Sequence, residues 1–455
     1  MISLSLQQIV AATGGNLKGA DLVIQNIFTD TRQVASDGLF VALKGANFDA
    51  HDFIKKAEEA GAKALLVERE VSSELPQVIV ANSKEAMGKI AQKIVELSSA
   101  KFVGLTGSVG KTTVKEMIAC VLSLAGNTLA TKGNLNNDIG VPLTLFRLEK
   151  DIEYAVIEMG ANQPGDIRYA SGLVHPDVAF VNNVAAAHLE GFGDLQGVAT
   201  AKGEIYPNIK SSGTALVNLD DAFAAYWLER IKTKVLTFGL NPAADINASQ
   251  IRLDENGCAE FILNIQGASV PVQLNVPGQH NVPNALACAG ACYALGIELS
   301  LITQGLQSFS GVAGRLQVYR PSELLTVIDD SYNANYTSLA AGIDVLMSQS
   351  GVKILALGDM GELGEHTREY HEKAGEYAKQ AGVDILVTIG VHTRTAQSAF
   401  KGKGFHAQTQ AELIEYVSSQ LIEKTTILIK GSRSARMENI VRALTREPVN
   451  IQGGC

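Results

Sequence analysis

The chain lacks several features that mark specialised classes of protein. Its 455 residues include only five cysteines, odd in number and scattered, which argues against a disulfide framework and makes the reducing cytoplasm the expected setting. The 38 basic residues do not outnumber the 47 acidic ones, so neither nucleic acid nor an anionic membrane is an expected partner. No apolar run approaches the roughly 20 residues that a membrane helix needs. The N-terminal stretch MISLSLQQIVAATGG also lacks the basic start and the long apolar run of a signal peptide.

Apolar residues, in contrast, make up 46% of the chain. Because a single hydrophobic core stops growing at roughly 250–300 residues, a chain of this length is expected to form two or three domains. The succession of strand and helix patterns places three domains at residues 1–83, 84–313 and 314–455. Cys288 and Cys292 lie four residues apart in an Ala-rich helical pattern, which we interpret as small-residue packing rather than a metal site. Internal repeats and low-complexity tracts are absent.

All three blocks predict mixed α/β structure. In the first, short apolar runs at 39–43, 62–68 and 76–82 predict strands, and residues 51–61 predict a helix. In the second, runs at 101–106, 154–160, 177–184 and 214–220 predict a mostly parallel sheet, since helical segments separate several of them. The third alternates strand and helix from residue 324 onward, the pattern of a doubly wound, Rossmann-like domain, although it has no GxGxxG fingerprint.

The stretch GLTGSVGKTT at 104–113 lies between the first predicted strand of the central block and a predicted helix. It departs from the usual phosphate loop, because Leu105 stands where that pattern requires glycine. Small residues nevertheless let backbone N–H groups point into one concavity, and the helix adds its positive dipole end. Lys111 can reach terminal phosphate oxygens, and the hydroxyl of Thr112 or Thr113 can bind Mg²⁺. We therefore predict a nucleotide phosphate site rather than a plain glycine-rich turn.

Other polar residues of the central block have both a functional and a structural interpretation. Glu158 closes the strand that begins at 154, where a carboxylate could reach the glycine loop or simply be solvated. His188 follows another strand across a short loop, but a lone histidine is more often structural than a ligand. Lys202 and Glu204 have the pattern of exposed residues on a helix.

Two further polar clusters stand at the ends of predicted elements. His280, Asn281 and Asn284 begin a helix, where the Asn281 side chain could cap the helix or the amides could face a nucleotide base. The segment IDDSYNAN at 328–335 places two carboxylates and two amides at the carboxyl end of a strand. Ligands of open α/β sheets bind at such ends, although an ordinary polar turn is the alternative.

Together, these motifs resemble the Mur ligases of peptidoglycan synthesis over almost the whole chain. TGSVGKTT, GNLNNDIGVP, AAAHLEGFG, AKGEI, GQHNVPNALA, GRLQ, DDSYNAN and KGSRSARME occur in the family's order. That family uses the shorter loop Thr-Gly-x-x-Gly-Lys-Thr, which accounts for Leu105. DDSYNAN is similar to the branch that adds D-alanyl-D-alanine to UDP-N-acetylmuramoyl-tripeptide, and TDTRQVASDGLFVALKGANFDAHDF is similar to the uridine-nucleotide domain of the last two ligases of the pathway. Tyr336 departs from the proline that many relatives carry there.

The resemblance implies a role for individual residues. The ATP phosphates would lie against Gly107, Ser108, Val109, Gly110, Lys111, Thr112 and Thr113. Thr112 and Glu158 would bind one Mg²⁺ and His188 a second, while Lys202 would carry an N-carboxylate (carbamate) beside the metal. From the central domain Asn281 and Asn284 would contact adenine, and Arg315, Asp330, Asn333 and Asn335 would approach the nucleotide from the third domain. The UDP-sugar peptide would face Thr31, Arg32, Lys44, Gly45, Asn134, Asn136 and Asn137.

The resemblance thus implies an ATP- and Mg²⁺-dependent amide ligase, monomeric and cytoplasmic, with Lys111, Lys202, His188 and Arg315 in catalysis. Its substrates would be UDP-N-acetylmuramoyl-tripeptide and D-alanyl-D-alanine, joined through an acyl phosphate, and residues 311–315 would form a hinge between the second and third domains. The alternatives are another ligase of the superfamily, either the tripeptide-forming enzyme or a folylpolyglutamate synthase, and a nucleotide-binding regulator without turnover.

Overall fold

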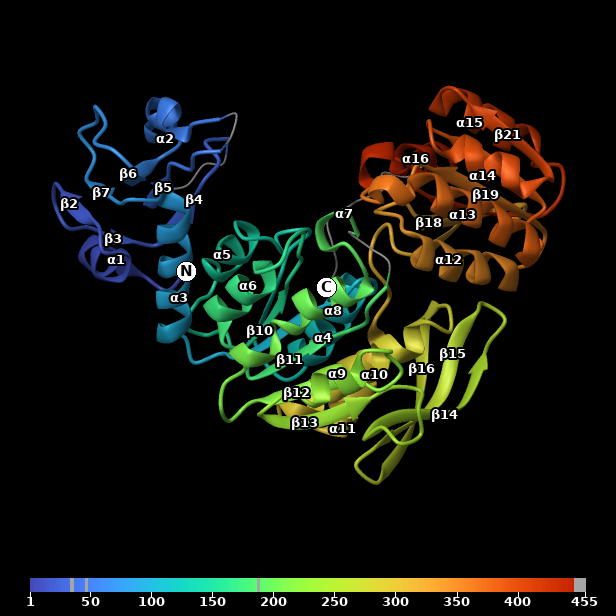
Figure 1. Ribbon diagram of the computed structural model, residues 1–455, viewed down its shortest axis with the longest axis horizontal. Helices are drawn as coiled ribbons and strands as arrows, with labels where there is room; N and C mark the ends of the chain where they lie inside the picture. Colours follow the sequence, from blue (N-terminus) through green and yellow to red (C-terminus); the bar gives the residue numbers. More distant parts are fainter. Residues whose placement is uncertain (33–36, 46–47, 186–188, 446–455) are drawn as a thin grey trace.

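The computed structural model describes residues 1–32, 37–45, 48–185 and 189–445. Each of its three large sheets is built from one consecutive stretch of chain, and they lie in three lobes, coloured blue, green to yellow, and orange to red in Figure 1. The helices formed by the described residues include none long and apolar enough to cross a bilayer.

The first lobe contains a five-stranded sheet with the order β2-β7-β6-β5-β4. Its strands are β2 (Asn16–Lys18), β4 (Asn26–Phe28), β5 (Gly38–Val41), β6 (Ala62–Val67) and β7 (Gln77–Ile79), beside a small ladder of β1 (Leu4–Ser5) and β3 (Val23–Ile24). The three strands predicted here are confirmed as β5, β6 and β7. The predicted helix divides into η1 (Ala50–Phe53) and α2 (Ile54–Glu59), while α1 (Leu6–Thr13) and α3 (Ser83–Leu97) pack together.

The central sheet has nine strands in the order β16-β15-β14-β13-β12-β11-β8-β10-β9. The four predicted strands are confirmed as β8 (Lys101–Thr106), β10 (Tyr154–Glu158), β11 (Val178–Val181) and β12 (Thr214–Asn218), and they are parallel as expected. Two further parallel strands, β9 (Thr128–Ala130) and β13 (Lys234–Phe238), were not predicted. Three further strands extend the sheet, and the pairs β14·β15 and β15·β16 are antiparallel: β14 (Ile246–Leu253), β15 (Cys258–Ile265) and β16 (Ala268–Pro277). The sequence analysis did not predict these three.

Helices cover both faces of the central sheet. One core packs α4 (Lys111–Ser123) with α10 (Asn281–Ala294) and α11 (Leu299–Ser308). Cys288 and Cys292 are fully buried within it, which confirms the packing interpretation. The other core includes residues of α5 (Gly140–Leu145), α6 (Asp166–Val174), α8 (Leu195–Gly203), η2 (Tyr206–Asn208) and α9 (Ala224–Leu228).

The third lobe is the doubly wound domain that the sequence predicts. Its strand order is β17-β18-β22-β19-β20-β21, parallel except for the edge strand β17, with bounds β17 (Gln317–Ser322), β18 (Leu325–Asp330), β19 (Val352–Gly358), β20 (Ile385–Ile389), β21 (Lys403–Ala407) and β22 (Thr425–Lys430). One core receives α12 (Tyr336–Ser348), α13 (Thr367–Ala381) and α14 (Thr393–Phe400), and another receives α15 (Gln410–Ser419) and α16 (Glu438–Thr445).

The second and third lobes are in contact, and one segment of the chain connects them. The turn between β14 and β15 presents Asn256, whose side-chain oxygen accepts from Arg320 Nη2 at 3.0 Å and whose carbonyl accepts from Gln349 Nε2 at 3.2 Å. The connecting segment contains Gly311 and Gly314 at φ 97° and 72°, followed by Leu316 at φ 54°. A bulky residue rarely adopts this left-handed conformation, so backbone strain is stored at the connection.

Candidate active site

The residues that directly follow the neighbouring strand β11 fix the conformation of the glycine loop. Val109 N donates to Asn183 Oδ1 at 2.9 Å, and Ser108 N donates to the Asn183 carbonyl at 3.0 Å. Asn182 Nδ2 donates to the Val109 carbonyl at 3.1 Å. The sequence analysis did not select these two asparagines. The available signal was a polar pair directly after a buried strand, a place where parallel sheets gather ligands.

Helix α4 begins at this loop without a side-chain cap, so its first N–H groups and its dipole face the concavity. Gly110 precedes the helix at φ 79°, and a Cβ there would lie 2.7 Å from Asn284 Oδ1, so glycine is required. Lys111 Nζ folds back to donate to the Gly107 carbonyl at 2.7 Å. Burial lowers the pKa of Lys111, although the Glu158 carboxylate opposes that effect.

Lys202 is buried beside Lys111 rather than exposed on a helix surface. Its Nζ donates to the same Gly107 carbonyl at 3.1 Å, and the residue is only 1% exposed. Burial, together with the neighbouring charge of Lys111, places the pKa of Lys202 well below its usual range. This shift favours the neutral amine, which is the protonation state in which a lysine reacts as a nucleophile.

Glu158 ends β10 beside the loop and is buried, so the solvated alternative is wrong. Its Oε1 accepts from Asn136 Nδ2 at 2.8 Å, whereas Oε2 is buried with no partner among the described residues. A buried, unpaired carboxylate oxygen is costly unless a cation completes it, so the residue fits a divalent metal. Within the described ranges no three His, Cys, Asp or Glu side chains cluster for a metal, and His188 lies outside those ranges.

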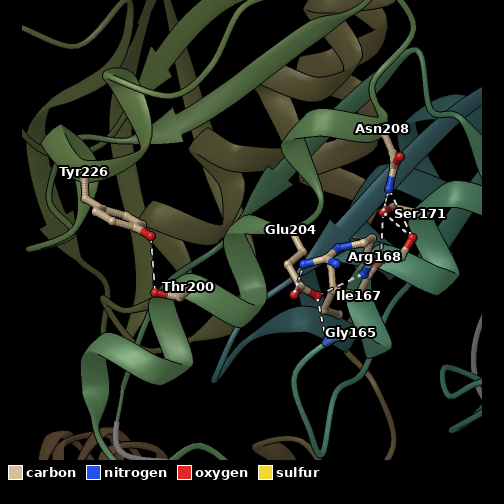
Figure 2. Close-up of polar contacts among 8 residues, drawn as sticks. All are labelled: Gly165, Ile167, Arg168, Ser171, Thr200, Glu204, Asn208 and Tyr226. Atoms are coloured by element: carbon tan, nitrogen blue, oxygen red, sulfur yellow. Dashed lines mark hydrogen bonds and ion pairs between the residues drawn. The ribbon is translucent and has the colours of Figure 1, made fainter.

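Glu204 anchors the helix that carries Lys202, so the surface interpretation of this residue was wrong. Its side chain is 11% exposed. It accepts from Gly165 N and Arg168 N at 3.0 and 3.3 Å, which supplies the cap that Gly165 cannot give to α6, and it pairs with Arg168 Nη2 at 2.9 Å (Figure 2). Thr200, on the same helix α8, also contacts the hydroxyl of Tyr226 at 3.2 Å (Figure 2).

Replacing Glu204 by alanine is expected to lower the free energy of unfolding by about 2 kcal/mol, because it leaves two helix N–H groups and Arg168 without their acceptor. Urea unfolding followed by the fluorescence of the single tryptophan measures this, since Trp227 Nε1 donates to the Ala199 carbonyl of α8. Glu229→Ala is the matched control, because that side chain is 75% exposed. Equal stability of the two variants would contradict a capping role.

A cavity of about 300 Å³ lies between the second and third lobes, beside the loop. Seven of the residues predicted to bind nucleotide line it: Val109, Gly110, Thr113, Asn281, Asn284, Arg315 and Asp330. Across the boundary Arg315 Nη2 donates to Thr112 Oγ1 at 3.3 Å.

Asn281 does not cap its helix with its side chain, since its Nδ2 donates to the Pro277 carbonyl and its Oδ1 accepts from Asn284 at 3.0 Å. Burial lowers the pKa of His280, another lining residue, to about 4, so its imidazole is neutral.

The DDSYNAN segment is organised by Lys430, which the sequence analysis did not select. Lys430 is buried, forms an ion pair with Asp330, and donates to the Asn333 carbonyl at 3.0 Å. Burial raises the pKa of Asp330 and lowers that of Lys430, while each partner's charge opposes the shift of the other. Asn335 caps α12 by accepting from Ser338 N at 2.9 Å. In this structure the two asparagines therefore shape the segment and do not line the cavity.

A second, more open cavity of about 760 Å³ lies in the first lobe. Thr31 and Arg32 line it, as do Phe48 and Phe53, whose rings stack at 5.2 Å between centroids. Arg32 pairs with Asp30 and lowers the pKa of that carboxyl to about 2. The sequence analysis missed this aromatic face.

The remaining residues predicted for the UDP-sugar peptide lie outside that cavity. Lys44 and Asp49 form an isolated antiparallel β-bridge through their backbones, and Gly45 N donates to the Phe48 carbonyl at 2.7 Å. In the GNLNND segment, Asn136 holds Glu158, the Asn134 carbonyl accepts from Asn136 N at 2.7 Å, and Asn137 Oδ1 accepts from Gly140 N at the start of α5. This segment therefore lies beside the glycine loop rather than in the first lobe.

Comparison with known proteins decides the family. Residues 23–104 match the model of the Mur ligase catalytic domain, residues 105–292 the Mur ligase middle domain, and residues 314–433 the Mur ligase glutamate ligase domain. The chain is a Mur ligase. Among its relatives is the UDP-N-acetylmuramoyl-tripeptide–D-alanyl-D-alanine ligase of Escherichia coli, 45% identical over 98% of this chain and 99% of the relative. The enzyme of the same name from Haemophilus influenzae is 39% identical over equal shares.

Solved structures of Mur ligases share the complete fold. A crystal structure of MurF from Acinetobacter baumannii superposes with a TM-score of 0.92 at 38% identity, covering 98% of this chain and 99% of that one. MurF from Thermotoga maritima, crystallised with ADP, gives a TM-score of 0.84 at 28% identity over 93% and 97% of the two chains. The three-domain α/β architecture of this Mur ligase is thereby established.

Proposed function

We propose that this Mur ligase joins D-alanyl-D-alanine to UDP-N-acetylmuramoyl-tripeptide at the cost of ATP, forming the pentapeptide precursor of peptidoglycan, ADP and phosphate. The observation that supports this most directly is 45% identity to the Escherichia coli enzyme of that name over 98% of the chain. The geometry of the site supports the same function. The phosphate loop, which has the Glu158 carboxylate beside it, faces residues of the third lobe across one cavity.

In the proposed reaction the terminal carboxylate of the tripeptide attacks the γ-phosphorus of ATP, and ADP leaves. Lys111 and the N–H groups at the start of α4 offset charge on the phosphoryl oxygens, so catalysis is mainly positioning and electrostatics. The amine of D-alanyl-D-alanine then attacks the acyl phosphate, the C–O bond to phosphate breaks, and an amide forms. Arg315, which reaches Thr112 from the third lobe, adds positive charge on the same side.

Thr112, Glu158, His188 and Lys202 are the residues proposed to hold Mg²⁺, which when bound supplies Lewis-acid charge at the phosphates. For Lys202 we propose a carbamate, because burial beside Lys111 lowers the pKa of this amine and favours the neutral form, which can add CO₂ and release a proton. The anion formed in this way would offset the adjacent cation and complete a hard oxygen ligand set.

In this proposal each lobe has a separate binding role. Residues 1–83 hold the UDP-sugar through Thr31, Arg32, Lys44 and Gly45, and residues 84–313 bind ATP. Residues 314–455 bind the incoming dipeptide and close on the nucleotide with Arg315 and Asp330, while Asn333 and Asn335 hold the DDSYNAN segment in shape. The GNLNND amides face the peptide part of the substrate. The enzyme acts in the cytoplasm as a monomer.

Two other functions fit the chain less well. Folylpolyglutamate synthase from Mycobacterium tuberculosis is similar in structure, with a TM-score of 0.65 at 15% identity, so that likeness shows the fold alone. A regulator without turnover is disfavoured because Lys111, Glu158 and Lys202 converge at one loop.

Phosphate release with ATP and Mg²⁺ tests the proposal directly. We expect release only when UDP-N-acetylmuramoyl-tripeptide and D-alanyl-D-alanine are both present, with a uridine product heavier by the dipeptide residue in mass spectrometry. Release that needs a single amino acid or a folate instead would reject the assignment in favour of another ligase. Bound ATP without release under any combination would favour the regulator.

A further inference from the structure

A buried lysine on the helix of the phosphate loop has no part in the proposed reaction. Lys115 lies about one turn after Lys111 on α4, and none of its side chain is exposed. Its Nζ pairs with Glu116 Oε1 at 2.6 Å and donates to the Thr131 carbonyl, also at 2.6 Å. Because a buried ammonium group is costly without fixed acceptors, Lys115 and the Thr131 carbonyl hold each other in place.

Thr131 is the residue at which the chain leaves the central sheet. It directly follows β9, and its N–H still donates to a carbonyl of β10 at 3.0 Å. In the parallel ladder of these two strands Tyr154 N donates to the Asn127 carbonyl. The two-residue repeat of that ladder would bring Glu158 N to the Thr131 carbonyl. In the structure that carbonyl accepts from Lys115 instead, so the ladder ends there.

The hydroxyl of Thr131 replaces the missing ladder bond. Its Oγ1 accepts from Glu158 N at 3.0 Å, and the two residues are only 1% and 2% exposed. The chain that departs at Thr131 then brings back Asn136, whose Nδ2 donates to Glu158 Oε1 at 2.8 Å and whose carbonyl accepts from Gly160 N at 2.8 Å. Residues 131–136 thus fix both the backbone and one carboxylate oxygen of Glu158. Oε2 is left without a partner among the described residues.

The contacts from Lys115 to Glu158 join the two parts of the proposed metal site. Thr112 stands in the first turn of α4, three residues before Lys115, whereas Glu158 ends β10. A divalent metal held by both side chains requires ligand distances that hold within a few tenths of an ångström, so the helix and the strand end must keep one spacing. Contacts behind the ligands maintain such spacings in metal sites, and losing one lowers metal affinity about 10- to 100-fold.

We propose that Thr131 and Lys115 are positioning residues that set the Glu158 carboxylate at the divalent metal beside the phosphate loop. This inference rests on the metal role proposed for Glu158 and names the residues that orient it. Without the Thr131 hydroxyl the backbone of Glu158 shifts to find another acceptor, and its carboxylate no longer meets a metal held by Thr112. Neither positioning residue touches the metal, so nucleotide binding in the absence of metal is unchanged.

The test measures binding of Mn²⁺, a cation that accepts the same oxygen ligands as Mg²⁺, in the presence of ADP. The loss of the electron paramagnetic resonance signal of free Mn²⁺ reports it without turnover. Thr131→Val, which keeps the size of the side chain, is expected to weaken Mn²⁺ binding about 10- to 100-fold. Thr131→Ser, which keeps the hydroxyl, should restore wild-type binding. Lys115→Met, which leaves the Glu158 N–H paired, should show a smaller loss. The affinity for ADP in the presence of EDTA should be the same in all of them.

Thr426→Val is the matched control. Thr426 is a buried threonine on β22 in the third lobe, and its Oγ1 donates to the Ser350 carbonyl at 3.0 Å. This variant should be less stable to urea and bind Mn²⁺ like the wild type. Unchanged Mn²⁺ binding in Thr131→Val, or an equal loss in Thr131→Ser or Thr426→Val, would overturn the inference.

Phosphate release by the wild-type enzyme with both substrates is measured in parallel. Its absence would reject the proposed function, whereas the comparison of Mn²⁺ binding does not depend on the acceptor. If Thr131→Val does not fold, Lys115→Met carries the test, and Mn²⁺ binding equal to that of the wild type then overturns the inference.

Discussion

Lys111→Ala is expected to lower kcat by about 10²–10³-fold, because the variant loses the positive charge that faces the transferring phosphoryl group. In the structure this side chain is held at the loop by the Gly107 carbonyl, at the start of α4. ATP-dependent phosphate release in the presence of both substrates is the measurement. The loss should fall mainly on kcat, since the backbone N–H groups that hold the other phosphates remain.

Lys63→Ala provides the control for this experiment. Lys63 is an exposed residue on β6 in the first lobe, so its removal changes net charge by the same amount without touching the loop. A Lys111→Ala enzyme with kcat within threefold of the control would show that the loop binds phosphate without assisting transfer.

Lys202→Ala is expected to lower kcat by about 10²-fold, because the buried amine is proposed to become a carbamate anion beside Lys111. Wild-type enzyme in CO₂-free buffer should lose activity and regain it on addition of bicarbonate, whereas the variant should not respond. Labelling with ¹³C-bicarbonate should give a carbamate signal in the wild-type protein alone. The burial that lowers the pKa of Lys202 favours the neutral, reactive form of the amine.

Lys210→Ala serves as its control, because that lysine is partly exposed and pairs with Asp177 at the amino-terminal side of β11. It should retain activity and bicarbonate response. Absence of a ¹³C signal in a fully active wild-type enzyme would reject the carbamate and leave Lys202 as a hydrogen-bond donor to the Gly107 carbonyl of the loop.

Local patterns in the sequence were sufficient for most of the fold. Short apolar runs separated by helical segments identify the parallel strands, because strands buried on both faces carry continuous apolar residues. The antiparallel extension β14–β16 was missed although its signals are present: apolar residues alternate along β15, and glycines at φ 77° and 86°, Gly257 and Gly267, stand at its two turns. Turn residues between alternating stretches predict hairpins.

The site was less accessible to sequence reasoning, because its decisive contacts join residues far apart in the chain. Glu204 caps a helix whose N-cap residue, Gly165, lies 39 residues earlier in the chain. Lys430 pairs with a carboxylate 100 residues away. No local pattern distinguishes such residues from surface charges, since an isolated glutamate or lysine is usually solvated. Only the sheet topology, which aligns Asp330 with Lys430 in register, brings them together.

The cavity between the second and third lobes has a consequence for affinity. Because Val109 and Asn284 line one side and Leu316 and Asp330 the other, only molecules with both lobes in this arrangement present the whole binding surface. The apparent dissociation constant for nucleotide is then the intrinsic constant divided by the population of that arrangement. A change at the distant contact between Asn256 and Arg320 can therefore weaken nucleotide binding without touching a single group that the nucleotide meets.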